Sequence, residues 1–223
     1  YAIKDPYDYP SIGTWINYDI IERAGVTDPY DLWQAGNWNW ETFLDICNAV
    51  TDDLDGDGVT DQWGVLNSVA RYFIYSNGGE IVAYNESTGR YEYSLNDPRN
   101  VRAIQFWGEL RSVYNVVGSG SYAEFAQGTA AFMFHQLLNG ARVYEGGCTN
   151  LGYVPFPNGP DVSSDYITNS GTDIMMIAFP ANIQDPEKVV KVVSDFRCIW
   201  DETKPYYLSI KESVDVRMDE NYV

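Results

Sequence analysis

Short apolar segments alternate with capped helices along most of the chain, and this order constrains the fold more than any other feature. Strand-like apolar segments are expected at four places: residues 13–18, 130–134, 151–155 and 174–179. The last of these is apolar throughout, as in a strand buried on both faces. Helices are expected at residues 19–24 and after the capping residues Asn39, Asp97 and Asp185, with shorter ones at residues 72–75 and 122–127. Alternating strands and helices predict an α/β domain built in layers.

Two of these helices carry apolar stripes at helical spacing. After Asn39 the stripe comprises Trp40, Phe43, Leu44, Cys47 and Val50. After Asp97 the expected buried side comprises Val101, Ile104, Leu110 and Val113, with Phe106 or Trp107. Between the two helices, residues 80–93 predict a β-hairpin around the turn at residues 85–89. Cys47 and Cys198 fall on apolar stripes, so we expect buried thiols there.

Carboxylates alternate along residues 53–61, in the pattern of an oxygen-ligand loop for calcium. Loop positions 1, 3, 5, 7 and 9 are filled, in order, by Asp53, Asp55, Asp57, the backbone carbonyl of Val59, and Asp61. Position 12, where such loops carry a bidentate glutamate, is Gly64. Four carboxylates at this spacing repel one another unless a cation lies between them. We therefore expect a structural Ca²⁺, with a solvated acidic turn as the alternative.

The charge balance limits the partners. The chain has 14 basic and 32 acidic residues, a net charge of −18. Such a surface repels phosphate backbones and anionic membranes, and it favours neutral or cationic ligands. We expect no nucleic acid partner and, since no long apolar run is present, no membrane insertion of this chain. Aromatic residues make up 15% of the sequence. Tyrosine and tryptophan offer flat apolar faces with polar rims, which suit sugar rings as well as protein cores.

Five segments, in this order, resemble the extracellular solute-binding proteins of family 1, which serve ABC importers. They are Gly13-Thr-Trp-Ile-Asn-Tyr-Asp19 with Ala24-Gly-Val26, Asn39-Trp-Glu-Thr-Phe43, Phe125-Ala-Gln-Gly-Thr-Ala-Ala131, Gly152-Tyr-Val-Pro-Phe-Pro-Asn-Gly-Pro160, and residues 173–179 followed by Asp185-Pro-Glu187. The resemblance implies a lobe of the class II periplasmic-binding-protein-like fold, with a mixed central sheet flanked by helices. It implies a hinge or crossover segment at residues 1–12 and a C-terminal-type lobe at residues 13–223. The N-terminal lobe of the family has no counterpart in this sequence, so we expect a fragment of a two-lobed protein.

The resemblance also implies a metal site and a compartment. Some family members, oligosaccharide binders among them, carry a structural calcium loop at this place, which adds Gln62 to the expected ligands. The full-length protein would be an extracellular, cell-surface lipoprotein whose signal and anchor lie outside this chain, and its partner would be an ABC permease.

Ligand contacts in the family lie on loops and strand ends that face the cleft between lobes. On this basis the candidate ligand-binding residues are Trp15, Asn77, His135, Gln136, Arg142, Ser170 and Gly171. Each has a plainer alternative: core packing for Trp15, chain reversal for Asn77, a structural histidine for His135 and a surface arginine for Arg142. Ser170 and Gly171 are chosen because polar loops next to rigid strands are usual binding positions.

We therefore expect a non-enzymatic receptor that binds an oligosaccharide, or another neutral small molecule, and delivers it to an ABC importer. The alternative is a carbohydrate-active enzyme domain, a glycoside hydrolase or lyase with a calcium-stabilised fold. A hydrolase needs two carboxylates that flank the scissile bond, and no such pair stands out in the sequence. A purely adhesive calcium module would need a second calcium loop in a short repeat, and the sequence has one loop.

Overall fold

The structure is a computed structural model, and it describes residues 2–4, 12–136, 140–162, 176–178, 182–201 and 216–217. Its elements in chain order are β1 (Ala2–Lys4), β2 (Ile12–Asn17), α1 (Tyr18–Ala24), α2 (Pro29–Gln34), α3 (Trp40–Val50), β3 (Trp63–Leu66), α4 (Ala70–Ser76), β4 (Val82–Asn85), β5 (Arg90–Tyr93), α5 (Pro98–Ser112), β6 (Val117–Gly118), α6 (Tyr122–Ala126), β7 (Ala130–Gln136), α7 (Gly140–Glu145), β8 (Leu151–Val154), β9 (Met176–Ala178), α8 (Pro186–Asp201) and β10 (Val216–Arg217).

A six-stranded mixed sheet forms the centre of the fold, in the order β10-β8-β2-β7-β3-β6. Strand β2 runs antiparallel to both of its neighbours, β7 and β8. The pairs β7–β3, β3–β6 and β8–β10 are parallel. All strands of this sheet except β2 therefore point the same way, and their carboxyl ends meet along one side. We call this side the carboxyl edge; its described residues are 67–71, 119–121, 135–142 without 137–139, and 155–159.

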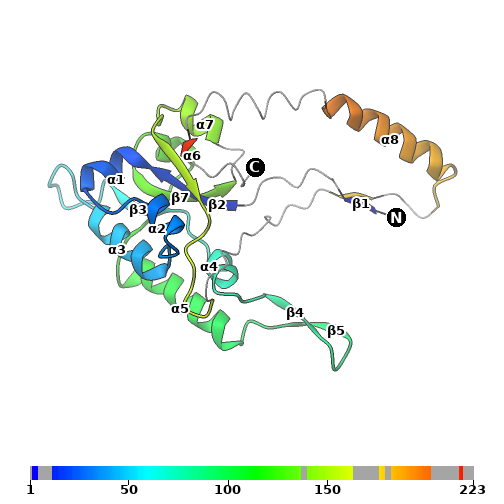
Figure 1. The fold of residues 1–223 in the computed structure, drawn as a ribbon, viewed down its shortest axis with the longest axis horizontal. Helices are drawn as coiled ribbons and strands as arrows, with labels where there is room; N and C mark the ends of the chain where they lie inside the picture. The colour runs from blue at the N-terminus through cyan, green and yellow to red at the C-terminus, as the bar shows by residue number, and fades with distance from the viewer. Residues whose placement is uncertain are drawn as a thin grey trace.

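Helices cover both faces of the sheet (Figure 1). On one face α1, α3, α4 and α5 pack on a core that includes Ile16, Phe43 and Phe132. On the other face α6 and α7 pack on a second core that includes Trp15 and Met133. Phe132 and Met133 are neighbours in β7 and lie in different cores, as the alternation of side chains along a strand requires. The expected α/β fold, with a mixed central sheet flanked by helices, is confirmed.

The helix boundaries follow the capping signals. Asn39 caps α3: its side chain accepts hydrogen bonds from the backbone of Glu41 and Thr42, and Thr42 completes a capping box. Asp97 caps α5 with a proline in its first turn, and α1 ends at Gly25, whose φ of 65° is the left-handed conformation that favours glycine. Helix α8 begins at the expected Pro186.

The expected buried side of α5 is wrong in part. Val101, Ile104 and Val113 are exposed, whereas Leu110 is buried as expected. Ala103, which the stripe omitted, is buried with it, and Phe106 stacks on Trp40 with a centroid distance of 4.5 Å. The apolar residues of this helix form two overlapping stripes. The stripe with residues 103, 106 and 110 is the buried one, because Phe106 stacks on Trp40.

Two parts of the structure lie outside the central sheet. Strands β4 and β5 form the expected hairpin, which projects from the main body beside α5 (Figure 1). Strand β1, in the expected hinge segment, pairs antiparallel with β9 in a sheet of two strands. Residues 176–178 therefore join the expected hinge segment and not the sheet of the lobe. No described helix is long and apolar enough to cross a membrane.

Candidate ligand-binding and metal sites

The carboxyl edge is the part of the fold where a ligand site is expected on physical grounds. In open α/β sheets, ligands bind outside the carboxyl ends of the strands, because the loops that follow neighbouring strands meet there. His135 and Gln136 end β7 at this edge, opposite Gly13 and Ile12 at the start of β2. Arg142 follows on α7. Three of the predicted ligand residues thus gather at one side of the sheet.

Trp15 does not present its face at this edge. Its side chain is 1% exposed, and its ring meets the ring of Tyr153 edge-on at a centroid distance of 4.9 Å. The indole Nε1 donates to the backbone carbonyl of Gln136 at 3.2 Å. A Cβ added at Gly140 would lie 2.3 Å from the indole Cη2, so α7 begins directly against this ring. The structure gives Trp15 a packing role in place of the predicted ligand stacking.

His135 is half-buried, and its backbone carbonyl accepts the Tyr153 hydroxyl at 3.4 Å. Its Nδ1 accepts the backbone N–H of Gln136 at 2.9 Å. Burial and, second, the positive charge of Arg142 lower the pKa of the imidazole below its ordinary value. The exposed Arg142 lies over the ring of Tyr122, with 5.5 Å between guanidinium carbon and ring centroid.

Asn77 is fully buried, and its side chain bonds to other parts of the protein, whereas a ligand contact was predicted. Its Nδ2 donates to the backbone carbonyl of Arg99 at 3.0 Å and to the carboxylate of Asp161 at 2.7 Å. Its Oδ1 accepts the backbone N–H of Asp161 at 3.0 Å. These bonds tie the end of α4 to α5 and to the segment after β8, which leaves the side chain no free group for a ligand. The predicted Ser170 and Gly171 lie outside the described residues.

The loop after β3 contributes residues that the sequence patterns did not single out. Ser68 is fully buried and its Oγ has no hydrogen-bond partner. The Nε of Arg71 is also buried without a partner, while its Nη2 donates to the Tyr72 hydroxyl at 3.2 Å. Such unpaired polar atoms are uncommon in protein interiors and mark places where water or a ligand binds. No sequence signal marked these residues, because strand β3, which ends just before them at the carboxyl edge, was not predicted.

The acidic loop folds around its first carboxylate. Asp53 accepts the backbone N–H groups of Gly58 at 2.7 Å, Gly56 at 2.8 Å and Asp57 at 3.2 Å. These bonds, the one from Gly58 foremost, lower the pKa of the Asp53 carboxyl, which keeps it ionised. Gly56 and Gly58 have φ of 79° and 90°, conformations that favour glycine. The loop therefore has the tight backbone that a small cation requires.

Three carboxylates converge in this loop. Oxygen atoms of Asp53, Asp55 and Asp61 all lie within 4.8 Å of one another. The carboxylate of Asp57 is not in this group, and its Oδ1 accepts the backbone N–H of Val59 at 2.8 Å. The convergent set thus contains three of the four predicted aspartates. It is an oxygen-only donor set of the kind that calcium prefers.

Gln62 points away from this group. It is 4% exposed, its Oε1 accepts a hydrogen bond from Arg23 of α1, and its Nε2 donates to the carbonyl of Val50 at the end of α3. Its backbone carbonyl accepts the N–H of Asp52 at 2.9 Å. Its oxygens are thus committed to the protein, and the structure assigns Gln62 to anchoring the loop instead of the predicted ligand role.

Gly64 at loop position 12 also has a packing reason. A Cβ at this residue would lie 2.5 Å from the Cβ of Cys47, because β3 approaches α3 closely there. A glutamate at this position is therefore incompatible with the packing of β3 on α3.

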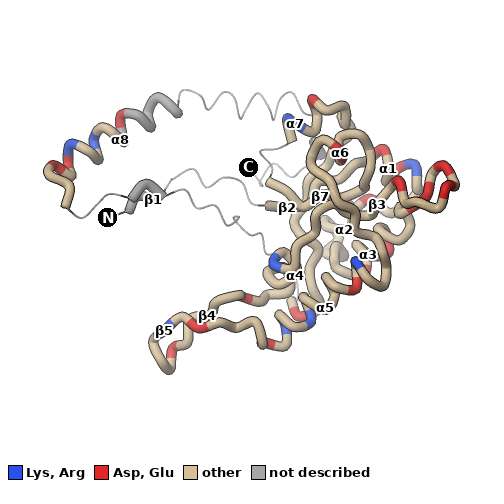
Figure 2. Tube along the Cα trace, turned by 180° about the vertical axis from the view of Figure 1, so that it is seen from behind, with Lys and Arg blue, Asp and Glu red and all other residues tan. Residues whose placement is uncertain are grey.

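In Figure 2 the acidic loop lies at the end of the main body away from the start of β2. The loop and the carboxyl edge are separate parts of the structure.

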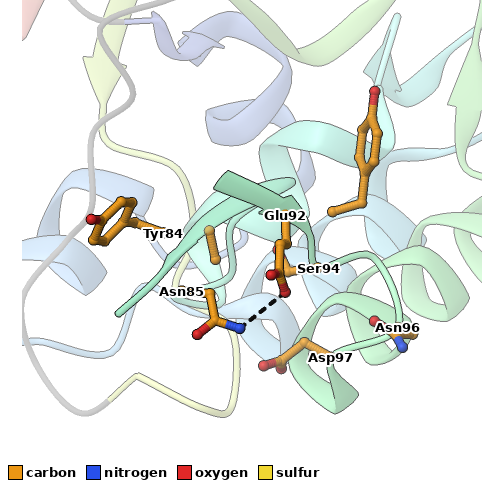
Figure 3. Close-up of a pocket in the computed structure, with 8 residues that line it drawn as sticks. Tyr84, Asn85, Glu92, Ser94, Asn96 and Asp97 are labelled. Atoms are coloured by element: carbon orange, nitrogen blue, oxygen red, sulfur yellow. Dashed lines mark hydrogen bonds between the residues drawn. The ribbon is translucent and has the colours of Figure 1, made fainter. Parts of the chain in front are cut away.

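A shallow hollow of about 380 Å³ lies between the β4–β5 hairpin and the start of α5 (Figure 3). Its carboxylates are held ionised: hydrogen bonds from Asn85 and Thr88 lower the pKa of Glu92, and those from Arg99 lower the pKa of Asp97. Figure 3 shows the Glu92 carboxylate directed at Asn85, with Tyr84 pointing away. None of the predicted ligand residues lines this hollow, so we do not place the ligand site there.

No family model matches the chain. Among solved structures, it is similar to an ABC substrate-binding protein from Listeria monocytogenes in complex with cycloalternan, with 20% identity, a TM-score of 0.54, and coverage of 67% of this chain and 38% of the other. It is also similar to UspC from M. tuberculosis, with 20% identity, a TM-score of 0.57, and coverage of 83% and 50%. A third structure is the maltose/maltodextrin-binding domain MalE from Bdellovibrio bacteriovorus bound to maltotriose, with 19% identity, a TM-score of 0.53, and coverage of 74% and 41%. The chain is therefore similar in fold to the ABC solute-binding proteins, of which it spans half the length or less.

Proposed function

We propose that this chain is part of a carbohydrate receptor that binds an oligosaccharide outside the cell and delivers it to an ABC importer. The observation that carries the proposal is the fold shared with substrate-binding proteins, two of which are described in complex with cycloalternan or maltotriose. Within that fold, His135, Gln136 and Arg142 lie at the carboxyl edge, joined by Ser68 and Arg71. Hydroxyl, amide and guanidinium groups are suited to the hydroxyls of sugars.

Binding would place the glycan against this edge and against the other lobe of a full-length receptor. The pairing of β1 with β9 supports a two-stranded connection between lobes, because both strands lie outside the six-stranded sheet. Closure of two lobes about such a connection is a common route to ligand capture. In this proposal residues 176–178 belong to the connection, and the chain returns to the sheet of the lobe at β10.

We propose that Asp53, Asp55 and Asp61 hold a structural Ca²⁺. The ion would neutralise the repulsion among their carboxylates and so fix the loop between α3 and β3. Gln62 anchors the end of the loop to Val50 and, through Arg23, to α1. The ion would therefore stabilise the α1–α3–β3 corner, and its place away from the carboxyl edge supports a role in stability only (Figure 2).

An enzymatic function is the weaker alternative. Glycoside hydrolysis uses two carboxyl groups on either side of the scissile bond. The described loops of the carboxyl edge contain no aspartate or glutamate. This distribution supports a receptor, which binds its sugar and leaves it intact.

The test is isothermal titration calorimetry of the full-length protein, in Ca²⁺, against a panel of neutral and acidic oligosaccharides of two to six sugars. Chromatography of the recovered ligand follows each titration. We expect micromolar or tighter binding of one glycan class and its complete recovery. Release of shorter sugars would favour the enzyme, and binding of no glycan in the panel would contradict the proposal.

A further inference from the structure

The basic residues of the main body are few, and their distribution is uneven. The described part of residues 12–162 contains seven arginines and no lysine: Arg23, Arg71, Arg90, Arg99, Arg102, Arg111 and Arg142. Arg99 and Arg102 each pair with a carboxylate, those of Asp97 and Asp161. Arg23 donates to Gln62, and Arg90 lies in the exposed hairpin. The remaining three border the carboxyl edge, and no salt bridge joins them to a described carboxylate.

Two of the three arginines meet in the loop after β3. Arg111 of α5 reaches this loop through its Nη2, which donates to the carbonyl of Ser68 at 3.0 Å. Arg71 stands three residues after Ser68, with its guanidinium 5.0 Å from the centroid of the Tyr72 ring. Among the described residues its polar partner is the Tyr72 hydroxyl, and its Nε is buried with no described partner. Arg71 thus combines a full positive charge with unused donors.

The third arginine lies across the edge, after β7. Arg142 rests on the ring of Tyr122 and is near enough to His135 to act on its titration. Strands β3 and β7 are direct neighbours, with Leu66 opposite Met133, so both loops belong to the same edge. Figure 2 shows a basic segment at α4 and another at α7, both on the side of the main body where β2 begins.

The charge at this edge is opposite to that of the whole chain. The chain carries a net charge of −18, which by itself favours neutral or cationic ligands. The described loops of the carboxyl edge have no acidic residue. The carboxylate of Glu124 accepts hydrogen bonds from Ser121 of this edge and forms no described salt bridge with Arg71 or Arg142. Unpaired guanidinium groups beside apolar walls attract anions strongly, and their forked donors match carboxylate and sulfate groups.

We propose that the ligand of the carboxyl edge is an acidic glycan, whose charged groups are bound by Arg71 of α4 and by Arg142 of α7. This inference rests on the proposed receptor function and narrows its ligand class. Each acidic group is a sugar carboxylate or a sulfate ester, since both offer a guanidinium two oxygens that accept a pair of hydrogen bonds. Arg111 is held by Ser68 and adds positive potential without a direct contact.

The experiment compares charged and neutral forms of the same glycan on the full-length protein. One pair is tri-galacturonate and its fully methyl-esterified form, and a second pair is a sulfated galactose disaccharide and its desulfated form. Calorimetry at low salt is expected to give about tenfold or tighter binding for the acidic member of one pair, because a charge-assisted hydrogen bond contributes about that factor. The preference is expected to shrink as NaCl is raised, because salt screens exposed charges.

The variants Arg71→Gln and Arg142→Gln are expected to remove most of this preference, because they should weaken binding of the acidic member more than binding of the neutral member. Arg90→Gln in the hairpin changes the net charge by the same amount and should change neither affinity. Equal binding of acidic and neutral members would overturn the inference and leave the receptor function standing. An equal loss in Arg90→Gln would overturn the assignment to these two arginines. Binding of none of the glycans would contradict both proposals.

Discussion

The positive charge of Arg142 in α7 acts on the imidazole of His135 at the end of β7. Burial of the imidazole and, second, the charge of Arg142 lower the pKa of His135. His135 is the only histidine in the sequence, so its ring protons give a single titrating signal by NMR. In Arg142→Gln the repulsion is lost, and the pKa of His135 should move upward towards its ordinary value. Arg90→Gln serves as the control. If the pKa of His135 were unchanged in both variants, the charge of Arg142 would not act on the imidazole.

The lowered pKa of His135 also predicts how stability depends on pH. The unfolded chain binds this proton at about pH 6.5, whereas the folded chain binds it only at lower pH. As pH falls from 7.5 through that window, the unfolded state takes up more protons, and the free energy of unfolding decreases. Urea denaturation at pH 7.5 and 5.5 should therefore show a smaller loss for His135→Gln than for the unmodified protein. An identical loss would show that His135 does not contribute.

Replacing Asn77 is expected to weaken the whole lobe. Asn77→Ala removes three hydrogen bonds and leaves the N–H of Asp161 without its partner. We expect a loss of about 2–4 kcal/mol in the free energy of unfolding, measured by urea denaturation. Asn96→Ala is the matched control, because Asn96 is exposed, and it should change stability by less than about 0.5 kcal/mol. A similar small effect of Asn77→Ala would contradict the described network.

Two glycine-to-alanine changes should alter the free energy of unfolding in opposite directions. Gly64→Ala forces a methyl group to within 2.5 Å of the Cys47 Cβ and should cost about 1–3 kcal/mol. Gly108 lies inside α5 with nothing within 4 Å of an added Cβ. Gly108→Ala should stabilise the protein by about 1 kcal/mol, because alanine favours the helix more than glycine does. Thermal melts of both variants check the pair, and a destabilised Gly108→Ala would argue against the described helix surface.

The calcium proposal predicts a change that depends on the metal. A free Ca²⁺ concentration of a hundred times the dissociation constant of the site would stabilise the fold by about 2.7 kcal/mol. Asp55→Asn should therefore lower the Tm in Ca²⁺ and leave it unchanged or slightly raised in EDTA, where one repelling charge is gone. Asp45→Asn on the exposed side of α3 should show no such dependence. If Asp55→Asn lowered the Tm equally in both buffers, the loop would not bind the ion.

Much of the fold was predictable because its signals are local. The cap at Asn39 and the proline after Asp97 set two helix starts, and the stripe from Trp40 to Val50 sets the buried face of α3. Strand β3 was missed because it has four residues, too few for a periodic pattern. The α5 face was partly misassigned because its choice depends on Trp40, a distant partner that the helix sequence does not contain.

The site was less predictable, because burial depends on what packs against a residue. Trp15 and Asn77 are residue types that often bind sugars, and both are buried by neighbours from distant segments, Tyr153 and Asp161. No sequence motif singled out Arg71. It became a candidate ligand residue only once the structure showed that β3 ends before it at the carboxyl edge. The convergence of Asp53, Asp55 and Asp61 was easier to predict, since the three come from one continuous segment. Gln62 was misassigned because its side chain bonds to α1 and α3, which the loop sequence does not contain.

The contact between Asn77 and Gly159 has an evolutionary consequence. A Cβ at residue 159 would lie 2.2 Å from the Oδ1 of Asn77, so any side chain there would displace the amide that joins α4, α5 and the segment after β8. Neither residue can change alone without loss. In related sequences these two positions are expected to vary together, and a lineage that gives up the glycine should also have given up the asparagine.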